Sequence, residues 1–423
     1  MATSAKFRMS EGMIPLRRLA LFLGILMSGG SFVFPRIPML AVILVLTFML
    51  KGPSLGIRKE MNGIWLLLLA ILVVTMIGGA GLDPIPTATR YANFLGGILL
   101  LGIYIDEDRG TLSRDFFFLG NIFTVQAIVT LILSETLNGL FSVFPIRETD
   151  YHTIGFLFTY HVMLEDSTIF YRPDGFFFEP GIYQIYLNLT LYLALFVFKS
   201  RIWGAVALLA VLASQSTTGL IIGIALAAIY YIRLLPTATV VEKIAGIVLA
   251  PLIAIPLFLV AQENLSTKLT GVTVGSRWAR EYDLYTGLRV VEQYPLTGIG
   301  FDYDRYYQIA ARYGYLESSL SQNSLTERPN SNGVVTLFYS VGIPLALIFL
   351  FGLFRQRFFR HKLMIFALLM LSLGSEAVLL TPFFLMLVFS GLLVTRRVMR
   401  RTGTAVAPPR GSRFAAPARL PHL

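Results

Sequence analysis

The sequence contains no cysteine, only four histidines and few charged residues. The absence of cysteine excludes disulfide bonds, thiolate nucleophiles and cysteine-ligated metal sites. Four histidines spread along the chain do not suggest a histidine-rich metal centre. Charged residues make up 14% of the 423 residues, whereas soluble domains average about 25%. This composition excludes an ordinary water-soluble enzyme.

Apolar residues dominate what is present. Hydrophobic residues make up 55% of the chain, and the mean hydropathy is +0.70. A bilayer span needs about 20 predominantly apolar residues, so the sequence predicts an all-α, polytopic transmembrane helix bundle of about 12 spans. The apolar runs that can cross a bilayer cover residues 19–35, 37–50, 61–79, 91–105, 116–134, 180–198, 202–214, 217–232, 244–261, 333–354, 363–378 and 380–395.

The positive charge follows the pattern expected of membrane topology. The formal net charge is +11. With the N-terminus in the cytoplasm, the inner segments hold 24 of the 35 Lys and Arg residues, and the short outer turns hold only Arg36 and Arg90. Because cytoplasmic loops carry such an excess, both termini are predicted to be cytoplasmic, and no nucleic-acid partner is needed to explain the charge. The first apolar run follows Arg17 and Arg18 without a small-residue cleavage site, which predicts a retained span.

Two outer loops are much longer than the turns between the other apolar runs. Loops of this length usually carry function or helices of their own. The two halves of the chain show no internal repeat, which disfavours an inverted-repeat transporter. The predicted parts are N-terminal membrane helices (1–135), a first outer loop (136–179), central membrane helices (180–261), a large outer loop (262–332), C-terminal membrane helices (333–396) and a disordered basic tail (397–423).

Arginines mark the first predicted helix of the large outer loop. Ser276 is predicted to cap a helix over residues 277–293. On that helix Arg277 and Arg280 share a face, and Arg289 follows. Paired guanidinium groups can hold a diphosphate through bidentate hydrogen bonds. The alternative, which spacing alone favours, is that these arginines pair with neighbouring acids on a solvated helix face.

The same loop is rich in aromatic residues. Asp302 or Asp304 is predicted to cap a second helix that runs to about Tyr313. Sugar rings pack against aromatic planes, and phenol hydroxyls hydrogen-bond to sugar hydroxyls. Aromatic residues also form belts at the headgroup level of membranes, and both interpretations stay open. The residues are Tyr282, Tyr285, Tyr294, Phe301, Tyr303, Tyr306, Tyr307, Tyr313 and Tyr315.

The end of the first outer loop places charged residues at the predicted membrane boundary. Arg172, Asp174 and Glu179 lie among apolar residues directly before a span. Partial desolvation would raise the proton affinity of Glu179, which suits a general base. The alternative is a carboxylate favoured by the helix dipole, with Pro180 at the first helical position.

Four segments, taken in order, carry a family resemblance. RPDGFFFEPGIY (172–183) places an Arg and a Glu-Pro pair before a span, and ASQSTTGLIIG (213–223) places a polar kink containing Gln215 before the next helix. SRWAREYDLYTGLRVVEQYPLTGIGFDYDRY (276–306) ends in P-x-x-G-x-G, and SNGVVTLFYSVG (331–342) opens a span. Together they resemble the bacterial O-antigen polymerase (Wzy) and O-antigen ligase (WaaL) superfamily of membrane glycosyltransferases, and most of all its exopolysaccharide polymerases.

One departure from the family pattern separates its two branches. The ligases usually carry His-Asn where this chain has Ser331-Asn332, and that histidine is thought to serve in acceptor activation. No histidine lies within residues 262–332. The resemblance therefore favours a polymerase and leaves the general base open. The candidates are Glu179, Asp174 and His161.

The resemblance implies a GT-C-like architecture in the bacterial inner membrane, with the active site facing the periplasm. Such a polymerase transfers the growing glycan from undecaprenyl diphosphate onto an incoming lipid-linked repeat unit. Membrane lipids and a chain-length regulator are the other partners it implies, and no cofactor is expected. The alternatives are an O-antigen ligase, with lipid A core as acceptor, and a lipid-linked oligosaccharide flippase.

The expected site follows from this chemistry. Arginines at the lipid–water boundary would stabilise the diphosphate leaving group as the glycosidic bond breaks. The outer loops show no dense carboxylate cluster, so a metal-independent glycosyltransferase is expected. The expected catalytic residues are Glu179, Arg277, Arg280 and Asn332, and the expected substrate-binding residues are Arg172, Asp174, Arg289, Tyr282, Tyr285 and Gln215.

Overall fold

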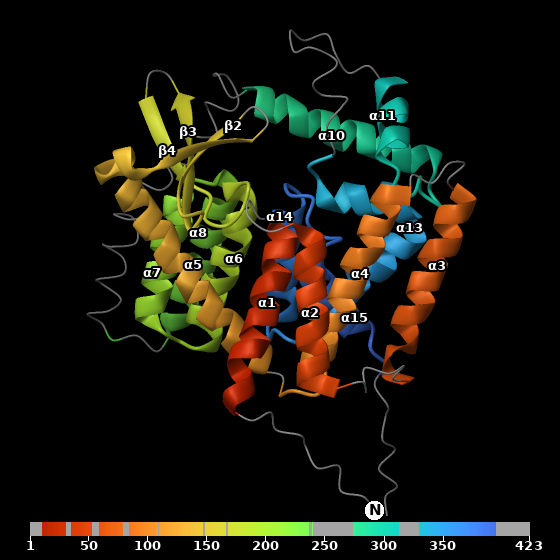
Figure 1. Cartoon of the computed structure of the whole chain (residues 1–423), viewed down its shortest axis with the longest axis horizontal. Coiled ribbons are helices and arrows are strands. Elements are labelled where there is room, and N and C mark those ends of the chain that lie inside the picture. Colours follow the sequence, from red (N-terminus) through yellow and green to blue (C-terminus); the bar gives the residue numbers. More distant parts are fainter. Residues whose placement is uncertain are drawn as a thin grey trace, which may run out of the picture.

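The protein is mostly helical (Figure 1). The predicted span 244–261 and the predicted tail 397–423 lie outside the described residues. The computed structural model describes residues 11–30, 35–52, 59–78, 84–108, 110–146, 149–165, 168–236, 239, 274–312 and 330–394.

The long helices run side by side in one bundle, and α10 lies across one end of it (Figure 1). A π-helical turn, Leu193–Val197, continues α6. The helices are α1 (Ile14–Gly29), α2 (Arg36–Lys51), α3 (Asn62–Gly78), α4 (Pro84–Tyr104), α5 (Thr111–Thr136), α6 (Pro180–Tyr192), α7 (Arg201–Ala213), α8 (Thr217–Leu234), α10 (Val274–Gln293), α11 (Tyr303–Arg312), α13 (Gly333–Phe354), α14 (Lys362–Leu373) and α15 (Pro382–Leu392).

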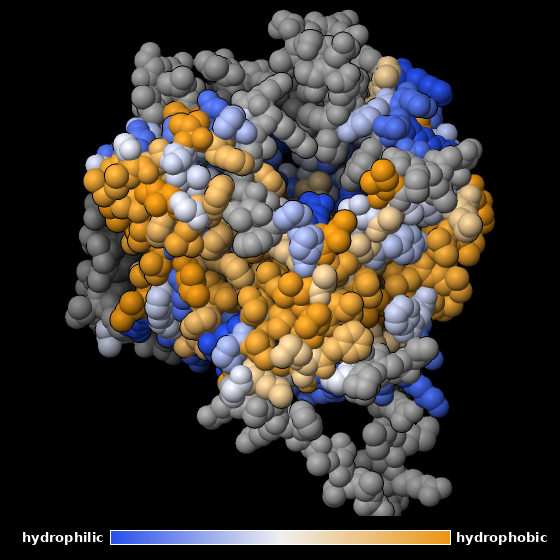
Figure 2. All heavy atoms as spheres, in the orientation of Figure 1, coloured by the Kyte–Doolittle hydropathy of each residue, from blue (hydrophilic) through white to orange (hydrophobic). Residues whose placement is uncertain are grey.

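Apolar side chains cover the outside of the bundle as well as its core. Figure 2 shows a broad apolar band across the middle of the molecule, with polar surface toward both ends. Large apolar side chains on the outside of the bundle are exposed, such as Ile202 at 77% and Leu66 at 68%. Water would disfavour so large an apolar surface, whereas lipid accepts it. The band is therefore consistent with an all-α membrane protein.

Five helical segments within the described residues are long and apolar enough to cross a membrane. Three further apolar helices are shorter. The count of about 12 spans and the cytoplasmic termini stay predictions. The five segments are Lys59–Ile77, Thr111–Thr136, Pro180–Val197, Thr217–Leu234 and Gly333–Phe354.

A four-stranded antiparallel sheet occupies most of the first predicted outer loop, and the sequence analysis predicted no strand there. Its strands follow one another as a meander, and it lies at the same end of the bundle as α10 (Figure 1). Each strand is short, so its period-two pattern is a weak signal beside the long apolar runs. The strands are β1 (Ser142–Ile146), β2 (Thr149–Ile154), β3 (Phe158–Glu165) and β4 (Thr168–Pro173).

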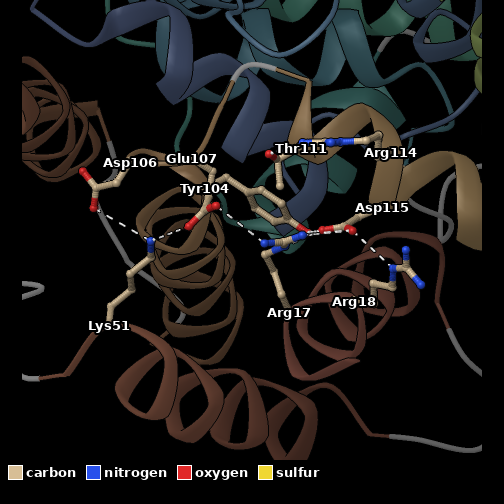
Figure 3. Close-up of polar contacts among 9 residues, drawn as sticks. All are labelled: Arg17, Arg18, Lys51, Tyr104, Asp106, Glu107, Thr111, Arg114 and Asp115. Atoms are coloured by element: carbon tan, nitrogen blue, oxygen red, sulfur yellow. Dashed lines mark hydrogen bonds and ion pairs between the residues drawn. The ribbon is translucent and has the colours of Figure 1, made fainter. Parts of the chain in front are cut away.

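A buried charged cluster joins four helices at the opposite end of the bundle (Figure 3). Asp115 is 1% exposed, and its Oδ2 accepts from Arg17 Nε at 2.5 Å and from the Tyr104 hydroxyl at 3.0 Å. Lys51 Nζ lies 3.1 Å from Glu107 Oε1. Because buried carboxylates need such partners, this cluster fixes the ends of α1, α2, α4 and α5 relative to one another.

Candidate functional site

The sheet brings the polar residues of the first outer loop together. In the pairing of β3 with β4, His161 lies directly opposite Arg172. Asp174 follows the end of β4, and its backbone amide donates to the carbonyl of Thr159 at 2.8 Å. Because residues directly opposite on paired strands are neighbours, His161, Arg172 and Asp174 lie at one edge of the sheet.

Asp174 is a buried carboxylate held by His161. It has no exposed surface, and His161 Nδ1 lies 3.0 Å from its Oδ1 and 2.9 Å from its Oδ2. Burial raises the pKa of Asp174 to about 6, although His161 and Arg172 act in the opposite direction. Through its contact with His161, Asp174 holds the connection from β4 to α6, which suits a residue that positions its neighbours.

Glu179 stands at the start of α6 with its side chain exposed. It is the N-cap residue, and Pro180 follows at the first helical position. Its side chain makes no capping hydrogen bond to the helix. Glu179 therefore has the place at the N-terminal end of α6, ahead of Pro180, that the helix-dipole alternative expects, and its carboxylate is not engaged in a capping hydrogen bond.

Glu376 faces Glu179 from the connection between α14 and α15. It is 5% exposed, and the two carboxyl groups are in hydrogen-bonding contact. Gly181, in the first turn of α6, makes room for it, because a Cβ atom at that position would lie 1.9 Å from Glu376 Oε1. A carboxyl group from the far part of the chain thus lies against the N-terminal end of α6.

The surroundings of Glu376 favour its protonated form. Burial raises its pKa well above the usual range, and the neighbouring charge of Glu179 raises it further. The charges of Arg280 and Arg172 act in the opposite direction. Glu376 is then the partner that donates the hydrogen bond, and Glu179 accepts it. We call these four residues, Glu179, Glu376, Arg172 and Arg280, the glutamate site.

Helix α10 reaches the glutamate site because it is anchored to the start of α13. Asp283 is 1% exposed, and its Oδ2 accepts from Ser331 Oγ at 2.6 Å and from Ser331 N at 2.9 Å. Asn330 Nδ2 donates to the Asp283 carbonyl at 2.7 Å. Arg280 is exposed and lies three residues before Asp283, on the same helix face. The anchor therefore sets the position from which Arg280 extends.

Asn332 caps α13. Its Oδ1 accepts from the backbone amides of Val334 at 3.1 Å and Val335 at 3.0 Å. Its own amide donates to Asn330 Oδ1 at 2.8 Å. An Asn side chain at this position satisfies donors that the helix leaves open, so the structure gives Asn332, an expected catalytic residue, a helix-capping contact.

The P-x-x-G-x-G segment docks into a break in α13. Gly342 has a φ of 76° and interrupts the helical backbone. The amides of Ile299 and Gly300 donate to the carbonyls of Tyr339 and Ser340, at 2.7 and 3.0 Å, and the amide of Ile343 donates to the Pro295 carbonyl at 2.7 Å. The large loop thereby supplies the backbone partners that the break removes.

Gln215 joins the polar kink to β4. It adopts a φ of 50°, which is unusual for a residue other than glycine. Its Nε2 donates to the Tyr171 carbonyl at 3.3 Å, and Arg172 Nη2 lies 3.5 Å from its carbonyl oxygen. The structure therefore brings Gln215 and Arg172, two of the expected substrate-binding residues, into contact.

Arg289 and Tyr282, two further expected residues of α10, make contacts of other kinds. Arg289 pairs with Glu292 at 2.8 Å on the exposed face and lies over the ring of Tyr285, as the solvated-helix alternative expects. Tyr282 is 1% exposed in an apolar cluster with Val290, Tyr306 and Tyr339. Arg277 lies in α10, but its side chain is outside the described residues.

No family model, curated protein or solved structure matches the chain. The glutamate site therefore has to be interpreted from its own geometry. A carboxylate that accepts a hydrogen bond from a protonated carboxyl can take a proton from a hydroxyl. Two arginines beside it can stabilise phosphate charge. This arrangement can serve a group transfer from a phosphate leaving group to a hydroxyl acceptor.

Glu376 was not among the expected site residues. It is the only charged residue between Lys362 and Arg396, and a lone carboxylate in so apolar a stretch was the signal that could have identified it. Its partner could not be identified from the sequence, because Glu179 lies almost two hundred positions away along the chain. Across the part of the chain described here, no group of three or more His, Cys, Asp or Glu residues forms a metal-binding cluster.

Proposed function

We propose that the protein is a membrane glycosyltransferase of the Wzy type, a bacterial surface-polysaccharide polymerase. In this proposal it moves a growing glycan from undecaprenyl diphosphate onto the terminal hydroxyl of an incoming lipid-linked repeat unit. The observation that supports it most is the glutamate site, where the charges of two arginines act on a carboxyl pair in an apolar bundle. That the chain is a member of the Wzy and WaaL superfamily is part of this proposal, and it rests on the four sequence segments that carry the resemblance.

Each group of the site has a role in this reaction. The acceptor hydroxyl gives its proton to Glu179 as its oxygen attacks the anomeric carbon of the donor glycan. The bond from that carbon to the diphosphate oxygen breaks, and its electron pair leaves with undecaprenyl diphosphate. Arg172 and Arg280 stabilise the negative charge that develops there. The hydrogen bond from Glu376 holds the Glu179 carboxylate in position.

The position of the site fits a lipid-linked substrate. The apolar band suits contact with acyl chains (Figure 2), and Glu179 directly precedes the segment Pro180–Val197, one of the candidate spans. A diphosphate at the lipid–water boundary would then reach Arg172 while its polyprenyl chain stays in lipid. In the proposal this boundary is the periplasmic face of the bacterial inner membrane.

The ligase alternative differs only in its acceptor. In the ligases the position of Ser331 usually carries histidine, whereas here Ser331 is hydrogen-bonded to Asp283 and helps to anchor α10. Ser331 therefore has a structural role in this chain. A serine used in this way favours a polymerase over a ligase that transfers glycan to lipid A core.

The experiment is to delete the gene and follow the lipid-linked sugars. We expect a single undecaprenyl-diphosphate repeat unit to accumulate on the outer face, without long chains. Re-expression of the wild-type chain should restore long polymer. Full-length chains left on the lipid would instead identify a ligase, and a repeat unit trapped on the cytoplasmic face would identify a flippase. Either result would overturn the polymerase proposal.

A further inference from the structure

A polar cavity lies at the end of the bundle opposite the glutamate site. Its volume is about 870 Å³, which is within the range of small-molecule sites. It is formed where the start of α5, the end of α6 and the connection from α13 to α14 meet. None of the described residues that line it is acidic, and five carry a positive charge: Arg114, Arg355, Arg357, Arg360 and Lys362.

The loop that carries most of these cations is held by a buried glutamine. Gln356 has no exposed surface. Its Oε1 accepts from the amides of Phe358 and Phe359, both at 2.8 Å, and its Nε2 donates to the Phe359 carbonyl at 3.0 Å. Ser113 Oγ of α5 donates to the Phe358 carbonyl at 3.3 Å. The loop is therefore ordered before any ligand arrives, which reduces the entropic cost of binding.

The potential in this cavity is positive. The pKa of His361, which lines it, is lowered by burial and then by the charges of Arg233 and Arg360. The Tyr192 hydroxyl lies 3.1 Å from its Nδ1. With five cations and no acid among its described lining residues, the cavity favours an anion.

One wall of the cavity is apolar. Phe198 is 37% exposed and stacks on Phe117, with ring centroids 4.4 Å apart. Phe358 and Phe359 line the inner side. A ligand that fits must therefore combine an anionic group with an apolar part. The positive-inside rule accounts for cations in a cytoplasmic loop, but it does not require them to converge on a cavity or to sit on a loop held by a buried glutamine.

We propose that this cavity binds a phosphate group, and that an anionic phospholipid presents it at the membrane surface. Guanidinium groups hold phosphate oxygens through bidentate hydrogen bonds, and basic pockets between membrane helices bind lipid headgroups. The acyl chains of such a lipid would lie along Phe198 and the apolar band. The site is separate from the glutamate site and does not depend on the polymerase proposal.

The test compares two charge-matched variants of the full-length protein in dodecyl maltoside. Arg355→Gln with Arg360→Gln removes two exposed cations of the cavity, and Lys59→Gln with Arg201→Gln removes two exposed cations elsewhere. Each protein is titrated with dioleoylphosphatidylglycerol, dioleoylphosphatidylcholine and inorganic phosphate, and bound ligand is counted by native mass spectrometry. Size-exclusion profiles establish that all three proteins are folded.

We expect saturable binding of phosphatidylglycerol to the wild type and the control variant, and binding roughly tenfold or more weaker in the cavity variant. Phosphatidylcholine should not saturate. Saturable binding of inorganic phosphate alone, lost in the cavity variant, would support the phosphate site and assign it to a soluble anion. Equal binding of phosphatidylglycerol to both variants, or equal binding of the two lipids, would overturn the proposal.

Discussion

At the scale of single residues, neighbours decide what each carboxyl group can do. Glu179 and Asp174 lie five positions apart in the same segment, yet one is exposed and the other fully buried. Asp174 is in contact with His161, whereas Glu179 receives a hydrogen bond from Glu376. The sequence could name both as base candidates, but the choice between them depends on these long-range contacts.

Replacing Glu179 tests the proposed base directly. Glu179→Gln keeps the size and polarity of the side chain but removes its ability to take a proton. We expect polymer formation to fall by roughly 10²–10⁴-fold, the usual contribution of a general base. The rate is measured with purified protein and lipid-linked repeat unit. Glu135→Gln, an exposed carboxylate near the C-terminal end of α5, is the control and should keep the wild-type rate.

An unchanged rate in Glu179→Gln would exclude this residue as the base. Asp174 would then become the candidate, since burial places its pKa at about 6.

At the scale of elements, the helices of the large outer loop were predicted better than the sheet of the first one. The helix expected over 277–293 is α10, and the one expected to end near Tyr313 is α11. Capping residues and helix breakers act locally, so the sequence reveals them. The sheet depends on pairing between short strands, and strand propensity varies strongly with context.

Gly181 links the start of α6 to the connection between α14 and α15. Gly181→Ala would bring a Cβ atom to 1.9 Å from Glu376 Oε1, so the carboxyl group would have to move away from Glu179. We expect loss of most polymer formation while the protein still elutes as a folded species. Gly139→Ala is the control, because a Cβ atom there meets nothing within 4 Å. Wild-type activity of Gly181→Ala would show that the contact between the two carboxyl groups is dispensable.

At the scale of the whole molecule, polar surface lies toward the two ends of the bundle and apolar surface lies between them (Figure 2). Composition predicted an apolar membrane bundle, because 14% charged residues is well below the share in soluble domains. The sequence did not predict that α1, α2, α4 and α5 meet in a buried charged cluster (Figure 3). Arg17 and Asp115 are about a hundred positions apart, and only the packing of the helices brings them into contact.

The buried cluster is expected to contribute strongly to stability. Asp115→Asn removes the negative partner of Arg17, and loss of one member of a buried pair costs about 3–5 kcal/mol. We expect a clear fall in the thermal unfolding temperature in detergent. Asp106→Asn removes an acid whose side chain is 41% exposed, and it should change that temperature little. Equal effects of the two variants would mean that the cluster is not a stabilising feature of the bundle.

The break in α13 has a consequence for motion. Because the amides of Ile299 and Gly300 complete the hydrogen bonding of α13 on one side of Gly342, and Ile343 donates back to Pro295, the described part of the large loop next to this break cannot swing open as a free lid. Any displacement of that loop must expose carbonyls inside an apolar bundle or take the first half of α13 with it. The loop and that half-helix should therefore move as one lever with its pivot at Gly342, and their amides should exchange hydrogen together.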